Sequence, residues 1–145
     1  MVIKDTEIKI IGYMCLQYGK EYLKESLTSV KDYVDKFYVM YTPVGSQGNR
    51  TNIECPENKE ELFEICSTVL GDKMVWHENT YSTEGEHRSE IYKFSDGYDL
   101  VLTLDADEVL EEKDIQQALL LAYKTDKRYI GINGFINFWR SFSWY

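Results

Sequence analysis

Residues 99–110 read DLVLTLDADEVL, and this stretch joins an apolar segment to a cluster of acids. The apolar residues up to Leu104 are typical of a buried β-strand. Asp105, Asp107 and Glu108 then follow within four positions. A buried strand that ends in like charges either enters a solvated turn or holds a cation there. The segments on both sides of this stretch help to decide between the two.

Strand-like and helical patterns alternate along the rest of the chain. Strands are predicted over residues 7–16, 36–42, 73–81 and 99–104, with a strand-like aromatic stretch at 128–145, and helices over 20–34, 57–71, 84–97 and 111–124. Apolar spacing predicts three inward helix faces, formed by Leu23, Leu27, Val30 and Val34, by Leu62, Cys66 and Val69, and by Ile115, Leu119 and Ala122. Residues 43–56 contain both prolines and are expected to form a long loop.

This alternation predicts an α/β fold, a three-layer sandwich with a mostly parallel central sheet. Ligands of such sheets bind outside the carboxyl ends of the strands. The acids that follow Leu104 therefore lie where a binding site is expected.

The length of 145 residues suits a single domain with one core, covering 1–145. No apolar run reaches the length of a membrane span, and the opening MVIKDTEIKI lacks the apolar segment of a signal peptide, so a cytoplasmic location is expected. Cys15, Cys55 and Cys66 are widely spaced and form no CxxC pair. Neither a disulfide framework nor a structural zinc site is predicted from them.

The formal net charge of −9 limits the partners of this protein. An acidic surface without a basic cluster repels nucleic acid, so no nucleic-acid partner is expected. An anionic ligand would need positive charge from elsewhere, and a divalent cation is the obvious source.

The acidic cluster has the features of such a cation site. Asp105 and Asp107 are two positions apart, so in extended backbone both side chains point to the same face. Two adjacent carboxylates repel each other unless a cation neutralises them. Mg²⁺ or Mn²⁺ typically binds one or two carboxylates together with substrate phosphates. A solvated acidic turn before a helix remains the alternative, whereas an EF-hand is excluded because Leu110 stands where that loop needs glycine.

Four stretches resemble, in order and spacing, the family 2-like inverting glycosyltransferases with the GT-A fold. VLTLDADEVL resembles the D-x-D region of those enzymes, and IKIIGYMCLQYGKEYLKESLTSV resembles their opening strand and first helix. KFYVMYTPVGSQGN occupies the place of the second strand and nucleotide loop, and STEGEHRSEIYKFSDGYD resembles the helix before the D-x-D strand. The chain departs from the family in having Tyr41 and Thr42 at the end of the second strand, where an acid is usual, and Arg88-Ser89 in place of Arg-Asn.

The resemblance implies a site for a nucleoside-diphosphate sugar, most simply a UDP-sugar, that works with Mn²⁺ or Mg²⁺. Asp107 would hold the metal against the diphosphate, and Asp105 would contact the ribose or the metal shell. Arg88, Tyr41, Thr42 and Tyr13 are the further candidates for nucleotide-sugar binding.

Each of the other candidates has a structural alternative. Arg88 could instead form a surface salt bridge with Glu84 or Glu90, and Tyr41 could be a core residue rather than a platform for a base. His77 and His87 do not have metal-ligand spacing and are expected to be surface residues.

The expected function is transfer of the sugar, with inversion, to an unknown acceptor. The catalytic base of the family usually lies in a segment beyond the D-x-D motif that this chain does not contain, so no base is assigned and the chain is expected to be truncated relative to a full glycosyltransferase. A non-catalytic nucleotide-sugar-binding or assembly domain and a sugar-nucleotide nucleotidyltransferase are the alternatives. The aromatic segment 135–145 predicts self-association into a homo-oligomer.

Overall fold

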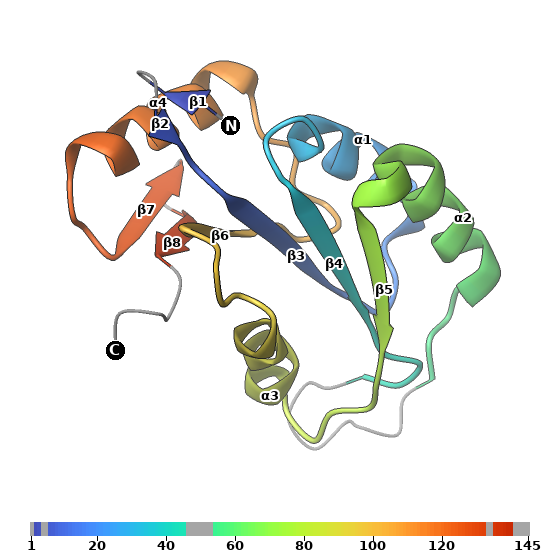
Figure 1. The fold of residues 1–145 in the computed structure, drawn as a ribbon. Helices are drawn as coiled ribbons and strands as arrows, with labels where there is room; N and C mark the ends of the chain where they lie inside the picture. The colour runs from blue at the N-terminus through green and yellow to red at the C-terminus, as the bar shows by residue number, and fades with distance from the viewer. Residues whose placement is uncertain (1, 4–5, 46–53, 133–134, 141–145) are drawn as a thin grey trace.

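A computed structural model describes residues 2–3, 6–45, 54–132 and 135–140 of the chain. Its centre is a six-stranded sheet with the strand order β5-β4-β3-β6-β8-β7 (Figure 1). These strands are β3 (Ile10–Leu16), β4 (Lys36–Tyr41), β5 (Met74–Glu78), β6 (Leu100–Thr103), β7 (Tyr129–Ile132) and β8 (Phe135–Arg140). A small antiparallel pair, β1 (Val2–Ile3) and β2 (Thr6–Glu7), precedes the sheet and is not predicted by the sequence pattern.

Helices connect the strands and cover both faces of the sheet. They are α1 (Lys20–Val30), α2 (Lys59–Leu70), α3 (Glu84–Ser89) and α4 (Glu112–Lys124), with 3₁₀ turns η1 (Gly71–Lys73) and η2 (Glu90–Lys93). The helix predicted over 84–97 is thus a short α-helix that tightens into a 3₁₀ turn. The predicted α/β architecture is confirmed at this level.

The sheet is mixed rather than purely parallel. The pairs β5–β4, β4–β3 and β3–β6 are parallel, as expected for strands joined by helical crossovers. Strand β8 runs antiparallel to both of its neighbours, β6 and β7. The tail from 128 therefore forms two strands of the sheet, and β8 lies inside the sheet rather than at its edge.

The larger of two apolar cores lies between the sheet and the helices α1, α2 and α4. The predicted inward faces of these helices are confirmed for Leu23, Leu27, Val30, Leu62, Cys66, Ile115, Leu119 and Ala122, which are buried, and for Val69, which packs against them partly buried. Val34 is buried as well, but it lies beyond α1, which ends at Val30 instead of continuing to 34. A smaller core lies on the other face, where Ile91 of η2 packs against Ile11 and Val101. Figure 1 shows α3 on the side of the sheet opposite to α1.

The connections of two adjacent parallel strands run in opposite directions. Strand β3 continues through α1 to β4, whereas β6, its neighbour on the other side, continues through α4 to β7. The carboxyl ends of β3 and β6 thus form a topological switch point, where open α/β sheets bind their ligands.

Strand β8 has hydrogen-bonded neighbours on both sides, and its Phe138 is fully buried. Residues 141–145 lie outside the described residues, so self-association through 135–145 stays a prediction. Among the helices that the structure describes, none is both long and apolar enough to cross a membrane.

Candidate functional site

A pocket of about 490 Å³ lies at the switch point. It is lined by residues from the carboxyl ends of β3, β4 and β6, from the start of α1, and from α3: Cys15, Gln17, Tyr18, Gly19, Glu21, Tyr22, Thr42, Glu57, Glu84, His87, Arg88, Asp105, Ala106 and Asp107. Four of the six residues predicted for nucleotide-sugar binding are brought together here, namely Asp105, Asp107, Arg88 and Thr42.

The acids after β6 form a tight turn rather than a continuation of the strand. Strand β6 ends at Thr103, and residues 106–107 form a turn. The backbone is therefore not extended here, and the argument that Asp105 and Asp107 point to the same face because they lie on an extended strand is wrong. The Asp105 amide donates to Oε2 of Glu108 at 2.9 Å, and the Glu108 amide donates to the carbonyl of Asp105. Glu108 therefore turns back onto Asp105.

Hydrogen bonds to side chains of α1 hold this turn in place. The hydroxyl of Ser26, which is buried, donates to the carbonyl oxygen of Asp105 at 2.9 Å. The hydroxyl of Ser29 accepts a hydrogen bond from the amide of Leu110. Burial raises the pKa of Glu108, and its hydrogen bond from the Asp105 amide opposes this. The position of the acidic turn is thus set by two serines of a helix about 80 residues earlier in the chain.

Arg88 connects α3 to the acidic turn. Its Nε donates to Glu84 at 2.8 Å, and its Nη1 donates to Oδ1 of Asp105 at 3.3 Å. Partial burial lowers the pKa of Arg88, but the two carboxylates outweigh this effect and raise it above the ordinary value. The predicted alternative of a salt bridge with Glu84 is therefore present, together with a contact to the acidic turn that sequence spacing does not reveal.

The carboxylate of Glu57 occupies the amino end of α1. Both oxygens of Glu57 accept hydrogen bonds from the Lys20 amide, at 3.2 and 3.0 Å, and Oε2 also accepts from the Gly19 amide at 2.9 Å. Gly19 has a φ of 127° and no side chain with which to cap the helix itself. Glu57, from the loop before α2, supplies that cap and lines the pocket as well.

Among the described residues that line the pocket, the balance of charge is negative. Five of them are carboxylates, and Arg88 is the one lysine or arginine in this described lining. The two positive features, Arg88 and the amino end of α1, are already bound by carboxylates of the protein. Asp107 is exposed, and among the described residues its carboxylate has no hydrogen-bond or ion-pair partner.

His87 is a pocket residue that the sequence interpretation missed. The expectation that it is a surface residue is wrong, because it is 3% exposed and stacks on Tyr81 with ring centroids 4.4 Å apart. Its Nε2 lies 2.6 Å from the carbonyl oxygen of Met40, which can only accept, so Nε2 carries the proton. Burial lowers the pKa of His87, which keeps the ring neutral near pH 7. His77 is half-buried and contacts Glu90 at 3.1 Å.

Cys15 also lines the pocket without having been singled out from the sequence. Burial raises the pKa of its thiol to about 12. A thiol that stays protonated at neutral pH is a poor nucleophile, so Cys15 shapes the pocket wall rather than reacting.

Tyr41 and Tyr13 are not brought to the pocket lining. Tyr41 is 2% exposed and stacks on Trp76 on the side of the sheet that faces α2, with centroids 5.1 Å apart. The alternative of a core tyrosine is the one observed. Tyr13 is buried in the smaller core, where burial raises its pKa to about 12. Neither ring is presented to a ligand in this conformation.

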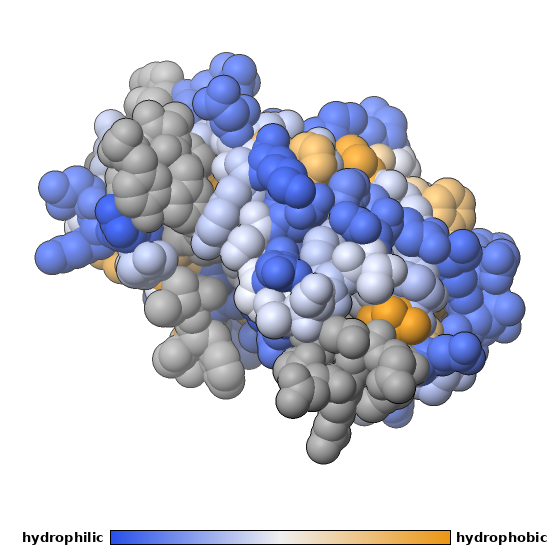
Figure 2. All heavy atoms as spheres, turned by 90° about the horizontal axis from the view of Figure 1, so that it is seen from below, coloured by the Kyte–Doolittle hydropathy of each residue, from blue (hydrophilic) through white to orange (hydrophobic). Residues whose placement is uncertain are grey.

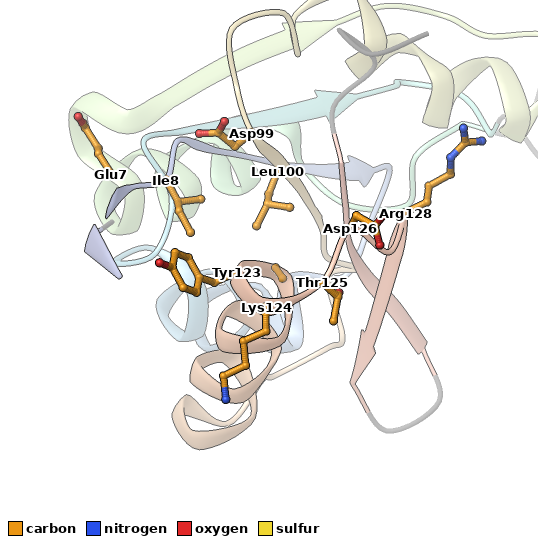
Figure 3. Close-up of a pocket in the computed structure, with 10 residues that line it drawn as sticks. Glu7, Ile8, Asp99, Leu100, Tyr123, Lys124, Thr125, Asp126 and Arg128 are labelled. Atoms are coloured by element: carbon orange, nitrogen blue, oxygen red, sulfur yellow. The ribbon is translucent and has the colours of Figure 1, made fainter. Parts of the chain in front are cut away.

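A larger cavity, of about 740 Å³, lies at the opposite end of the sheet (Figure 3). It lies at the amino ends of β3 and β6, beside the end of α4. Parallel sheets bind their ligands at the opposite, carboxyl ends of the strands. In Figure 3 the side chains of Lys124 and Arg128 extend away from the cavity. The carboxylate of Asp99 accepts a hydrogen bond from the Lys9 amide. We therefore assign the candidate site to the smaller pocket.

The surface seen in Figure 2 is mostly hydrophilic, and its hydrophobic residues are scattered singly or in small groups. On this face the described residues form no large apolar patch of the kind that marks a permanent protein interface. Such a surface suits a polar or charged ligand.

The acidic turn fits a divalent cation only in part. Within the described residues no group of three or more His, Cys, Asp or Glu side chains is arranged to hold a metal ion. Mg²⁺ and Mn²⁺ do not require such a cage, since they bind one or two carboxylates and complete their shell with water and substrate phosphates. Asp107 and the second oxygen of Asp105 are the groups that remain for that role.

No family model matches the chain, and no curated protein matches it either. Its function therefore has to be argued from the pocket and from the motifs.

Proposed function

We propose that this chain is a nucleotide-sugar-binding domain of a metal-dependent, inverting glycosyltransferase of the family 2-like, GT-A type. The ligand would be a nucleoside-diphosphate sugar, most simply a UDP-sugar, and the acceptor is unassigned. The observation that supports the proposal is the carboxylate of Asp107 at the switch point, which has no partner among the described residues and lies beside described positive groups that are already paired.

The chemistry of the pocket explains why a cation belongs to the proposal. A diphosphate would meet five carboxylates in this pocket, and both positive features there are already paired. A divalent cation on Asp107 would reverse the local charge and stabilise the leaving diphosphate as a Lewis acid. Asp105 would complete the cation site through its second oxygen, and Arg88 would hold Asp105 in place.

A binding domain without transfer activity is the second candidate, because inverting transfer needs a general base, and neither Cys15 nor His87 of the described lining is suited to that role. Cys15 is held protonated, and His87 donates its Nε2 proton to a backbone carbonyl. Glu108 accepts a hydrogen bond from the amide of Asp105 and is not among the residues that line the pocket. A nucleotidyltransferase receives less support, because the glycine-rich, basic phosphate loop of that class is missing from the start of the sequence.

The test is thermal unfolding with UDP in the presence of Mn²⁺ or of EDTA. A ligand at about one hundred times its dissociation constant stabilises the native state by about 2.7 kcal/mol, and we expect this only with Mn²⁺. Equal stabilisation in EDTA would contradict the cation site. A transfer assay with UDP-sugars then separates the two candidates, since the binding domain would give slow donor hydrolysis at most.

A further inference from the structure

The carboxylate of Glu57 occupies a position in the pocket that would otherwise attract an anion. It accepts three hydrogen bonds from the first amides of α1, and these amides carry the positive end of the helix dipole. The other positive group, Arg88, is shared between Glu84 and Asp105. An incoming anion therefore meets no unpaired positive group among the described lining residues.

Residues on both sides of Glu57 in the sequence are fixed by contacts of their own. Two residues earlier, the thiol of Cys55 contacts the carbonyl oxygens of Gln17 and Glu57. One residue later, the side chain of Asn58 caps α2 by accepting from the Glu61 amide at 3.0 Å. A half-buried carboxylate fixed at both flanks stays at the end of α1 without a large cost in side-chain entropy.

We propose that Glu57 is a specificity-determining residue, which excludes free anions from the pocket and makes the binding of a diphosphate depend on a cation. The inference rests on the proposed function, because it concerns how the same pocket selects its ligand. In this proposal Asp107 binds the cation. Glu57 occupies the amides at the end of α1, so the phosphates of a ligand cannot bind there directly.

The experiment measures the affinity of UDP and of inorganic pyrophosphate by calorimetry, with Mn²⁺ and with EDTA. The variants are Glu57→Gln, which removes the charge, and Glu57→Ala, which also uncovers the α1 amides. Glu60→Gln is the matched control, since Glu60 is an exposed acid in the first turn of α2, close to Glu57 in the sequence, and does not line the pocket.

In EDTA, both Glu57 variants should bind pyrophosphate and UDP at least about tenfold more tightly than the unmodified protein, because a like charge is removed beside the phosphates. Glu60→Gln should leave these affinities unchanged. In Mn²⁺ the gain should be smaller, so the ratio of the affinities with and without metal should fall.

Two results would overturn the inference. One is an unchanged affinity in EDTA for the Glu57 variants that are folded, as judged by cooperative unfolding. The other is an equal gain in Glu60→Gln, which would show an effect of net charge alone. Failure of the unmodified protein to bind UDP with Mn²⁺ would instead overturn the proposed function, and the pyrophosphate comparison in EDTA would still report on Glu57.

Discussion

The Nη1 atom of Arg88 donates a hydrogen bond to Oδ1 of Asp105, 3.3 Å away across the pocket. This contact joins α3 to the turn after β6 and neutralises one of the two aspartates of the D-x-D sequence. The other, Asp107, is exposed and unpaired among the described residues. The two carboxylates that look equivalent in the sequence therefore have different surroundings, and the first prediction tests whether they also differ in ligand binding.

Asp107→Asn should abolish Mn²⁺-dependent binding of UDP and leave the fold intact or slightly more stable, because it removes repulsion within the acidic turn. Asp105→Asn should weaken binding less, since an asparagine oxygen can still accept from Arg88. Calorimetry with UDP and Mn²⁺ measures both. Asp96→Asn, an exposed acid outside the pocket lining, is the control for loss of charge. Unfolding of Asp107→Asn with unchanged affinity in the folded fraction would make Asp107 structural.

Arg88→Gln should raise the affinity for Mn²⁺ alone several-fold, because Asp105 loses the positive charge that now competes with the metal. The loss of these partly exposed ion pairs should cost about 1 kcal/mol of stability or less. Titration of Mn²⁺ without nucleotide measures the effect. Lys93→Gln makes the same change of charge at a pair with Glu90 outside the pocket and should leave the Mn²⁺ affinity unchanged. An Arg88 variant with ordinary Mn²⁺ affinity would argue against a metal on Asp105.

His87 should make the protein less stable as the pH falls from about 7 toward 5. Its pKa in the folded state is lowered, chiefly by burial, with Arg88 lowering it further and Glu84 and Glu90 opposing. Between this lowered pKa and the ordinary value of about 6.5, the unfolded chain binds more protons than the folded one. The free energy of unfolding therefore falls as the pH falls through that window.

Denaturant unfolding at a series of pH values checks the His87 prediction. His87→Gln should flatten the slope of stability against pH in this window, whatever its effect on stability at pH 8. His77→Gln should retain the part of the pH dependence that comes from His87. An unchanged slope in His87→Gln would mean that its ring titrates alike in both states.

Gly19→Ala should destabilise the protein and weaken ligand binding together. A Cβ at Gly19 would lie 2.8 Å from the Cβ of Ala106, within the acidic turn, at a φ of 127° that other residues rarely adopt. We expect a loss of about 1–3 kcal/mol from backbone strain and contact. Gly97→Ala shares a positive φ but has nothing within 4 Å of its Cβ, so it reports strain alone. Equal effects of the two variants on nucleotide binding would show that Gly19 does not position the turn.

The sequence by itself determined most of the elements and their order, but not the β1–β2 pair or the division of the tail into β7 and β8. Its two periodicities, alternation in strands and three-to-four-residue spacing in helices, are local properties, and they located the strands of the parallel part and the four helices. The apolar run before Asp105 also pointed to the place where the structure has a pocket, because a buried strand in an α/β sheet presents its carboxyl end to ligands. The chain direction of β8 was not predicted, since an antiparallel neighbour leaves no local signature in so short a strand.

Only the tertiary structure decided how the pocket is lined. Arg88 and Asp105 are 17 positions apart, and Gly19 and Glu57 are 38 apart, so neither pair follows from a repeating pattern. The same is true of the burial of His87 against Tyr81, and of Tyr41 packing on Trp76 instead of facing the site. Contacts of this kind depend on which loops converge at the switch point, and that convergence is fixed by the packing of helices on a finished sheet rather than by any single segment of the chain.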